Sequence, residues 1–259
     1  MLKGKKGLII GVANDRSIAW GIAKVLALHG ATLAFTYQTE SFEKRVRPLG
    51  ESVGSKLILQ ADVQDQASLD RVFDDINQHW AKMDFLVHAI AYSDKKELSG
   101  RFINTSRANF LKSLDVSCFS LVELSKRVAP LMKDGGSITT VTYMGSQRVT
   151  PNYNVMGVAK AALESSVRYL ANDLGSQKIT VNAISPGPMK TLAGAVIGGA
   201  RTVYRTTESN APLNENPSLN SVGGTALYLI SDYGKHTTGE VIFVDGGYHI
   251  MGLPRMENL

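Results

Sequence analysis

The sequence predicts an α/β fold, in which a parallel sheet carries helices on both of its faces. Three observations support this prediction. Short apolar runs alternate with longer segments of helical periodicity along the whole chain. The first apolar run ends at a glycine and leads into a helical segment, as nucleotide-binding turns do. With 259 residues, of which 44% are hydrophobic and 20% charged, the chain has the size and composition of one globular domain.

The charge and the cysteine content restrict the class of function. The formal net charge is +5, which suits an anionic ligand such as a dinucleotide or an acidic protein. No basic run interleaved with aromatic residues appears, so we expect no nucleic-acid binding. Cys118 is the only cysteine, which excludes an intrachain disulfide and is typical of the reducing cytoplasm. The first apolar run is too short for a secretory signal or a membrane span, and we expect neither a membrane nor a metal as partner.

A first strand over residues 7–11 is expected to meet a helix over 17–29 through a glycine turn. Strand, turn and helix in this order point backbone N–H groups at a pyrophosphate, and Ser17 can cap the helix. The full G-x-G-x-x-G pattern is absent, however. Gly11, Ser17 and Ile18 are therefore a weak indication by themselves, and an ordinary strand-to-helix turn remains the alternative.

The second strand, over residues 31–37, ends at Gln38, where dinucleotide-binding folds contact the adenosine ribose. No basic residue follows before Lys44, so a 2′-phosphate would lack an immediate counter-charge, and the sequence favours NADH over NADPH. The alternative is that Gln38 is a solvated loop residue. A third strand over 56–60 is followed by Asp62, which can cap the next helix or its preceding turn.

The later elements continue the same alternation. A strand over 85–88 is followed by helical periodicity over most of 106–132. The remaining expected elements are a strand over 137–141, a helix up to about 175, a strand over 180–184, a helix over 221–231 and a strand over 240–244. The segment 192–217 is rich in Ala, Gly, Thr and Asn and has weak periodicity. It indicates a substrate-binding lid, with a disordered insertion as the alternative.

The stretch from Tyr143 to Lys160 follows the fifth expected strand. Pro151 suits the start of a helix. If Tyr153 to Lys160 is helical, their spacing of seven residues makes almost two turns and puts the phenol and the ammonium on one face. Such a pair is a candidate proton donor with an electrostatic helper. A snorkelling lysine beside a half-buried tyrosine is the common alternative.

The spacing of Tyr143, Tyr153, Met156 and Lys160 resembles that of the bacterial NADH-dependent enoyl-[acyl-carrier-protein] reductases. These enzymes are a divergent branch of the short-chain dehydrogenase/reductase superfamily, and the likeness runs over nearly the whole chain. Ordinary members of the superfamily place tyrosine four residues before lysine, where this chain has Met156. The resemblance implies one Rossmann-like doubly wound domain over 1–259, with a seven-stranded parallel sheet in the order 3-2-1-4-5-6-7, and a homotetramer.

The implied reaction is reduction of the C2–C3 double bond of a trans-2-enoyl thioester on acyl carrier protein with NADH, the last reductive step of fatty acid elongation. Hydride goes to C3, and negative charge develops on the thioester oxygen. By the resemblance, Tyr153 donates a hydrogen bond to that oxygen, while Lys160 holds the nicotinamide ribose and supports the oxygen with its charge. Tyr143 lies near the thioester. Met156 packs against the acyl chain, unless it is an ordinary core methionine.

Further contacts follow from the same resemblance. The implied cofactor-binding residues are Gly11, Ser17, Ile18, Gln38, Asp62, Val63, Ala89, Ile90, Lys160, Ile184 and Thr191. The implied substrate-binding residues are Ala91, Tyr92, Tyr143, Tyr153, Met156 and Ile197. Many relatives carry glycine and phenylalanine at Ala91 and Tyr92, so the fit of ligands at this turn is expected to differ.

Two other functions are alternatives to enoyl reduction. An ordinary carbonyl-reducing dehydrogenase is disfavoured by Met156 and by Asp115-Val116-Ser117, where such enzymes often carry a catalytic asparagine. A non-catalytic dinucleotide sensor is disfavoured because Tyr153 and Lys160 are both present.

Overall fold

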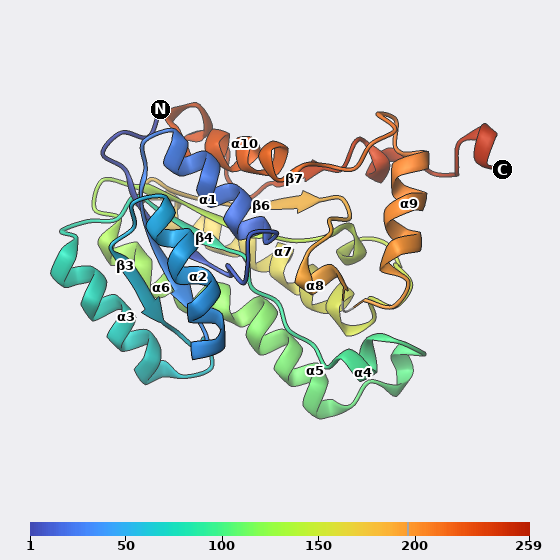
Figure 1. Ribbon diagram of the computed structural model, residues 1–259, viewed down its shortest axis with the longest axis horizontal. Helices are drawn as coiled ribbons and strands as arrows, with labels where there is room; N and C mark the ends of the chain where they lie inside the picture. Colours follow the sequence, from blue (N-terminus) through green and yellow to red (C-terminus); the bar gives the residue numbers. More distant parts are fainter. Residues whose placement is uncertain (196) are drawn as a thin grey trace.

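The computed structural model describes residues 1–195 and 197–259, and at its centre lies a seven-stranded parallel sheet in the order β3-β2-β1-β4-β5-β6-β7 (Figure 1). The strands are β1 (Lys6–Ile10), β2 (Thr32–Tyr37), β3 (Leu57–Gln60), β4 (Phe85–His88), β5 (Gly136–Val141), β6 (Ile179–Pro186) and β7 (Val241–Val244). The expected strand order is confirmed. Each strand lies within two residues of its expected range, because strands buried on both faces are marked in the sequence by short apolar runs.

Two hydrophobic cores lie on the two faces of the sheet. Successive residues of β1 point to opposite faces, so that Leu8 belongs to one core and Ile9 to the other. The core around Ile9 is closed by α1 (Ile18–Leu28), α2 (Glu40–Ser52) and α10 (Leu219–Ile230). The core around Leu8 is closed by α3 (Gln66–His79), α6 (Ser120–Val128) and α7 (Val155–Gly175). In Figure 1, α1 and α10 lie above the sheet and α3 below it.

The expected helical region 106–132 is interrupted. It consists of α5 (Arg107–Leu114), a π-helical turn (Asp115–Phe119), α6 and a 3-10 turn (Ala129–Leu131). Ser120 Oγ donates to the Val116 carbonyl at 2.7 Å within the wide turn. Such single wide turns inside α-helices are frequent at functional sites.

Because all strands are parallel, their carboxyl ends meet at one edge of the sheet, and α4 (Lys95–Leu98), α8 (Leu192–Ala195) and α9 (Ala200–Asn210) lie beyond this edge (Figure 1). Since α8 and α9 both lie within 192–217, much of this segment is helical, which its weak periodicity did not indicate. The reason is that α9 buries only Thr207 and Asn210, so it has no apolar stripe. Position 196 of this segment lies outside the described residues.

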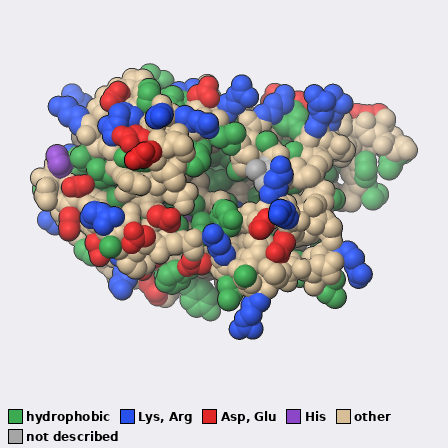
Figure 2. Space-filling view, turned by 60° about the horizontal axis from the view of Figure 1, so that its bottom comes forward, with side chains coloured by type: hydrophobic (Ala, Val, Ile, Leu, Met, Phe, Trp, Pro, Cys, Tyr) green, Lys and Arg blue, Asp and Glu red, His purple; other side chains and the backbone are tan. Residues whose placement is uncertain are grey.

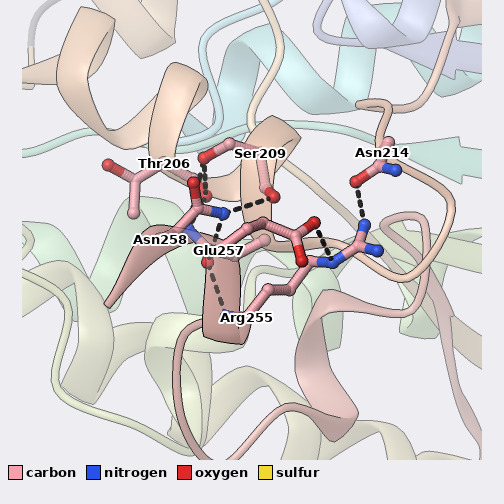
Figure 3. A network of polar contacts seen from close by, with 7 residues as sticks. Thr206, Ser209, Asn214, Arg255, Glu257 and Asn258 are labelled. Atoms are coloured by element: carbon pink, nitrogen blue, oxygen red, sulfur yellow. Dashed lines mark hydrogen bonds and ion pairs between the residues drawn. The ribbon is translucent and has the colours of Figure 1, made fainter.

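The C-terminal segment holds α9 from outside (Figure 3). The backbone N–H of Arg255 donates to Asn210 Oδ1 at 2.9 Å, and Asn258 Nδ2 donates to the Ser209 carbonyl at 2.9 Å. The Arg255 guanidinium also donates to the Asn214 side chain. The end of α9 is thus attached to the tail by side chains and backbone. Within residues 1–195 and 197–259, none of the helices combines the length and the apolar character that crossing a bilayer requires.

Candidate active site

The turn after β1 contains a close approach of two strand ends. Gly11 has a φ of 109°, and a Cβ atom there would lie 2.1 Å from the Ala89 carbonyl oxygen, so only glycine fits. Ser17 Oγ accepts from the backbone N–H groups of Ala13 and Asn14 at 3.0 and 3.1 Å. Ser17 therefore holds the turn and makes no capping hydrogen bond to α1, which corrects the expected cap. The glycine cradle and the N-terminus of α1 fit the pyrophosphate of a dinucleotide.

The expected adenosine contacts lie together at the ends of β2 and β3. Gln38 Nε2 donates to Asp62 Oδ2 at 3.1 Å across 24 residues of sequence. Asp62 Oδ1 accepts from the Gln64 backbone N–H at 3.0 Å, so this carboxylate also stabilises the turn before α3. That is the structural role expected for Asp62 as an alternative to cofactor binding. Glu40 at the start of α2 disfavours a 2′-phosphate nearby, whereas the charge of Glu43 is compensated by Arg47 at 2.6 Å.

Other expected cofactor residues lie at the same edge of the sheet. The backbone N–H of Ala89 donates to the Ile10 carbonyl, and that of Thr142 to the Ile184 carbonyl, at 2.9 and 2.8 Å. Thr191 Oγ1 accepts from the Gly194 backbone N–H at 2.9 Å and so stabilises α8. The expected residues that are partly buried against the two cores are Ile18, Val63, Ala89 and Ile90.

Two tyrosines face each other where β5 ends and α7 begins. The ring centroids of Tyr143 and Tyr153 are 5.0 Å apart, with an angle of 67° between the ring planes. Burial raises the pKa of the Tyr143 phenol to about 12 and raises that of Tyr153 as well. Both phenols therefore keep their protons at neutral pH, and each can act as a hydrogen-bond donor.

The position of Tyr153 corrects one sequence-based argument. The helix α7 begins at Val155, and Tyr153 lies in the turn before it, between Asn152 and Asn154, which both have positive φ. Tyr153 and Lys160 therefore do not share one helical face. The turn positions the Tyr153 ring against that of Tyr143, which the helical spacing could not indicate.

Lys160 is buried at the second turn of α7. Its Nζ donates to the Val141 carbonyl at the end of β5, at 2.7 Å. Burial lowers the pKa of Lys160 to about 8, and the nearby Cys118 and Glu164 act in the opposite direction. The ammonium is thus held just below the loop that carries Tyr143.

Glu164 is a buried carboxylate that sequence reasoning missed. It accepts hydrogen bonds from Thr142 Oγ1 at 2.7 Å and from Ser146 Oγ at 2.5 Å, on either side of Tyr143. It lies four residues after Lys160, one helical turn further along the same face of α7. The four-residue spacing from Lys160 was the only sequence signal that could have pointed to Glu164. The lysine and the loop that carries Tyr143 thus share one anionic neighbour.

The expected substrate residues divide into two groups. Buried Met156 and Tyr153 pack with Leu98, and the partly buried Tyr143 and Ile197 lie against them; these five residues are the Tyr153 cluster. The cluster joins α4, the loop after β5, α7 and the segment 192–217. Leu98 had no sequence signal, because α4 is a single short turn.

Ala91 and Tyr92 are the second group, and their side chains lie outside the cluster. The Tyr92 ring is 43% exposed and has the Lys112 ammonium 4.5 Å from its centroid. Its backbone N–H donates to Ser117 Oγ at 2.9 Å, and Ser117 Oγ in turn contacts Met156 Sδ at 3.8 Å. Figure 2 shows a hollow near the middle of the face that it presents, with hydrophobic side chains inside and Lys and Arg side chains around it.

A buried tyrosine and a buried lysine beyond the carboxyl ends of a doubly wound parallel sheet place this chain among the dinucleotide-dependent oxidoreductases of the short-chain dehydrogenase/reductase type. The family can be stated more narrowly. A family model described as Enoyl-(Acyl carrier protein) reductase matches residues 11–249, and the chain belongs to that family.

Similar proteins agree over their whole length. Enoyl-[acyl-carrier-protein] reductase [NADH] 2 of Rhizobium meliloti is 55% identical over 259 residues, which cover 100% of this chain and 97% of the relative. The crystal structure of the Anaplasma phagocytophilum enoyl-(acyl-carrier-protein) reductase in complex with NAD has a TM-score of 0.95 and 52% identity, covering 98% of this chain and 97% of that one. The resemblance drawn from Tyr143 to Lys160 is confirmed.

A further solved relative bears on the cofactor. The Bacillus cereus enoyl-acyl carrier protein reductase, solved with NADP+ and an indole naphthyridinone, has a TM-score of 0.95 and 46% identity, covering 97% of this chain and 99% of that one. Relatives of similar likeness have thus been solved with NAD and with NADP+.

Proposed function

We propose that this chain reduces the C2–C3 double bond of trans-2-enoyl-[acyl-carrier-protein] to the saturated acyl thioester with NADH, as the last reductive step of type II fatty acid elongation. The relatives named above support the reaction. The observation that carries it is the Tyr153 cluster, in which a buried phenol lies among apolar side chains from four segments. A proton donor in that setting suits an oxyanion at the head of an acyl chain.

Tyr153 donates the hydrogen bond that stabilises the developing thioester oxyanion. Its raised pKa keeps the phenol protonated, and burial strengthens the hydrogen bond because water competes less. Lys160, anchored on the Val141 carbonyl, places its positive charge below the same loop and supports the oxyanion. Tyr143, whose ring meets that of Tyr153, orients the thioester.

NADH supplies the hydride for C3 when it is bound. Gly11, Ser17 and the N-terminus of α1 would hold its pyrophosphate, and Gln38 with Asp62 would hold the adenosine. Lys160 would donate to the nicotinamide ribose. Glu40 at the start of α2 makes NADH the preferred dinucleotide.

The segment 192–217 is the substrate-binding lid within the single domain. Ile197 packs against the Tyr153 cluster, and Asn152 Nδ2 donates to the Gly198 carbonyl at 2.8 Å, so the lid contacts the catalytic loop directly. Met156 and Ile197 then line the path of the acyl chain.

The partner protein is acyl carrier protein, and the net charge of +5 suits an acidic carrier. The enzyme works in the cytoplasm, where Cys118 stays reduced.

The enzyme forms a homotetramer, and one apolar face suits contact between copies. This apolar face is formed by the π-helical turn, α6 and α7. Phe119, Val158 and Tyr169 are exposed on it, and Val122, Ala162 and Tyr169 line a groove there.

The reaction is tested with purified protein, NADH and a crotonyl thioester on carrier protein or coenzyme A. Absorbance at the nicotinamide band should fall, and the corresponding β-ketoacyl thioester should react far more slowly. Tyr153→Phe should slow the enoyl reduction roughly 10²-fold, because it removes the oxyanion donor.

Tyr233→Phe is the matched control, since Tyr233 is exposed and lies in the turn after α10. It should leave the rate unchanged. Faster turnover of the ketone than of the enoyl thioester would show that the chain is a carbonyl reductase.

A further inference from the structure

Two asparagines flank Tyr153 and reach in different directions. Asn154 Nδ2 donates to the carbonyls of Glu97 and Gly100, at 3.1 and 3.3 Å, on the two sides of Leu98. Asn152 Nδ2 donates to the Gly198 carbonyl at 2.8 Å, next to Ile197. Each asparagine thus holds one of the two outer parts of the Tyr153 cluster, the α4 side through Leu98 or the lid side through Ile197.

The backbone at both positions has a positive φ. Asn152 has a φ of 59°, which asparagine tolerates better than most residues, and Asn154 has a φ of 40° with a ψ of −122°, a conformation that glycine adopts most readily. Glycine would also tolerate this backbone, but it has no donor. At both positions, asparagine combines a positive φ with a short side chain that donates to a neighbouring carbonyl.

Asn154 also forgoes its usual local role. It occupies the N-cap position of α7, where asparagine is among the preferred residues, yet its side chain makes no capping hydrogen bond. The donor is directed instead across 57 and 54 residues of sequence, to the segment that carries Leu98. A residue that served only to start α7 would bond to α7.

We propose that Asn152 and Asn154 are specificity-determining residues, which fix the lid side and the α4 side of the Tyr153 cluster to the catalytic turn and so determine how well long acyl chains bind. A crotonyl group is short and lies close to the thioester, whereas a dodecenoyl group must extend along the apolar side chains of the cluster. The inference rests on the proposed function, since it concerns the acyl chain of that substrate.

The test compares trans-2-dodecenoyl and crotonyl thioesters in Asn154→Gly and Asn152→Gly, which keep the backbone conformation but lose the donor. We expect KM for the dodecenoyl thioester to rise roughly tenfold, equal to about 1.4 kcal/mol, in Asn154→Gly. KM for the crotonyl thioester should change less than about twofold, because a hydrogen bond that acts on a remote wall contributes little to a short chain. Asn152→Gly should change KM in the same sense, and the NADH dissociation constant should stay the same in both.

Lys178→Gly is the matched control, because Lys178 has a φ of 59° and lies in the turn before β6, at the opposite edge of the sheet. It should change neither KM. Asn154→Asp gives a second variant that keeps the side-chain shape but cannot donate to the two carbonyls. It should repeat the result of Asn154→Gly even if the glycine variant folds poorly.

Equal changes for the two thioesters, or no change for either, would overturn the inference, because a general weakening of the fold does not depend on acyl length. Failure of the unaltered enzyme to reduce any enoyl thioester would instead contradict the proposed function.

Discussion

Burial determines the chemistry of individual residues in this site. Tyr153 keeps its proton because burial raises its pKa, and Lys160 comes close to losing its proton because burial lowers its pKa to about 8. Glu164 opposes that loss, since its carboxylate lies one helical turn from the lysine and favours the charged form. The carboxylate is held in place by Thr142 and Ser146, so its charge is directed at the site.

We therefore expect kcat/KM for enoyl reduction to fall as the pH rises above about 8, where Lys160 loses its charge. Glu164→Gln removes the anion that raises the pKa of this lysine, so the alkaline limb should move to lower pH. The measurement is the pH profile of kcat/KM with crotonyl-coenzyme A. Glu51→Gln, an exposed glutamate near the end of α2, should leave the limb in place. The same limb in Glu164→Gln and in the unaltered enzyme would exclude this coupling.

Among the elements, the proposed lid segment, residues 192–217, is held unevenly at its two ends. The tail attaches to the end of α9 through Asn210 and Ser209 (Figure 3). Arg148 Nη1 donates to the Met251 carbonyl at 3.1 Å, which connects the tail to the loop after β5. The part around α8 has fewer described anchors, chiefly Thr191 and Asn152. The two halves of the lid should therefore open with different ease.

Limited proteolysis with thermolysin, which cuts before apolar residues, should first cleave within 192–199 and spare α9. NAD together with crotonyl-coenzyme A should protect the same segment, because the ligands contact it from the side of the Tyr153 cluster. Mass spectrometry of the fragments locates the cut. Identical cleavage with and without ligands would contradict the lid, and first cleavage in α9 would contradict the role of the tail.

For the whole molecule, the centre of the sheet contains a buried histidine that joins its layers. His88 at the end of β4 bonds through Nδ1 to Thr140 Oγ1 on β5 and through Nε2 to Ser120 Oγ on α6, both at 2.8 Å. Burial, and secondarily the charge of Lys160, lower the pKa of His88 to about 3. The folded protein therefore keeps this imidazole neutral, and both ring nitrogens serve the packing of strand against strand and helix.

This histidine should make stability fall in acid. In the unfolded chain it titrates near 6.5 and in the folded protein near 3, so the unfolded state binds the extra proton between these values. The free energy of unfolding should then decrease as the pH falls below about 6.5, by up to about 1.4 kcal/mol per pH unit from this group. Urea unfolding at several pH values measures it. His88→Gln should flatten the dependence, while the exposed His79→Gln should not. An unchanged slope in His88→Gln would assign the acid sensitivity to other groups.

The candidate site was only partly predictable. The motif residues were found because their spacing can be read from the sequence without knowing the backbone conformation; they are Tyr143, Tyr153, Met156 and Lys160. The turn that carries Tyr153 was not found, because Asn152 and Asn154 adopt conformations that the helical pattern did not indicate. Leu98, Glu164 and the two asparagines were missed since their contacts join segments far apart in sequence.

By itself the sequence determined the alternation of strands and helices and the family, because apolar periodicity and a spaced motif are local properties of the chain. The strand order also followed, once the family was recognised from the motif. Only the tertiary structure decided which distant side chains meet: that Gln38 bonds Asp62 and that the tail holds α9. The physical reason is that each of these contacts is a short polar interaction between segments that folding alone brings together, and such interactions leave no periodic trace in the sequence.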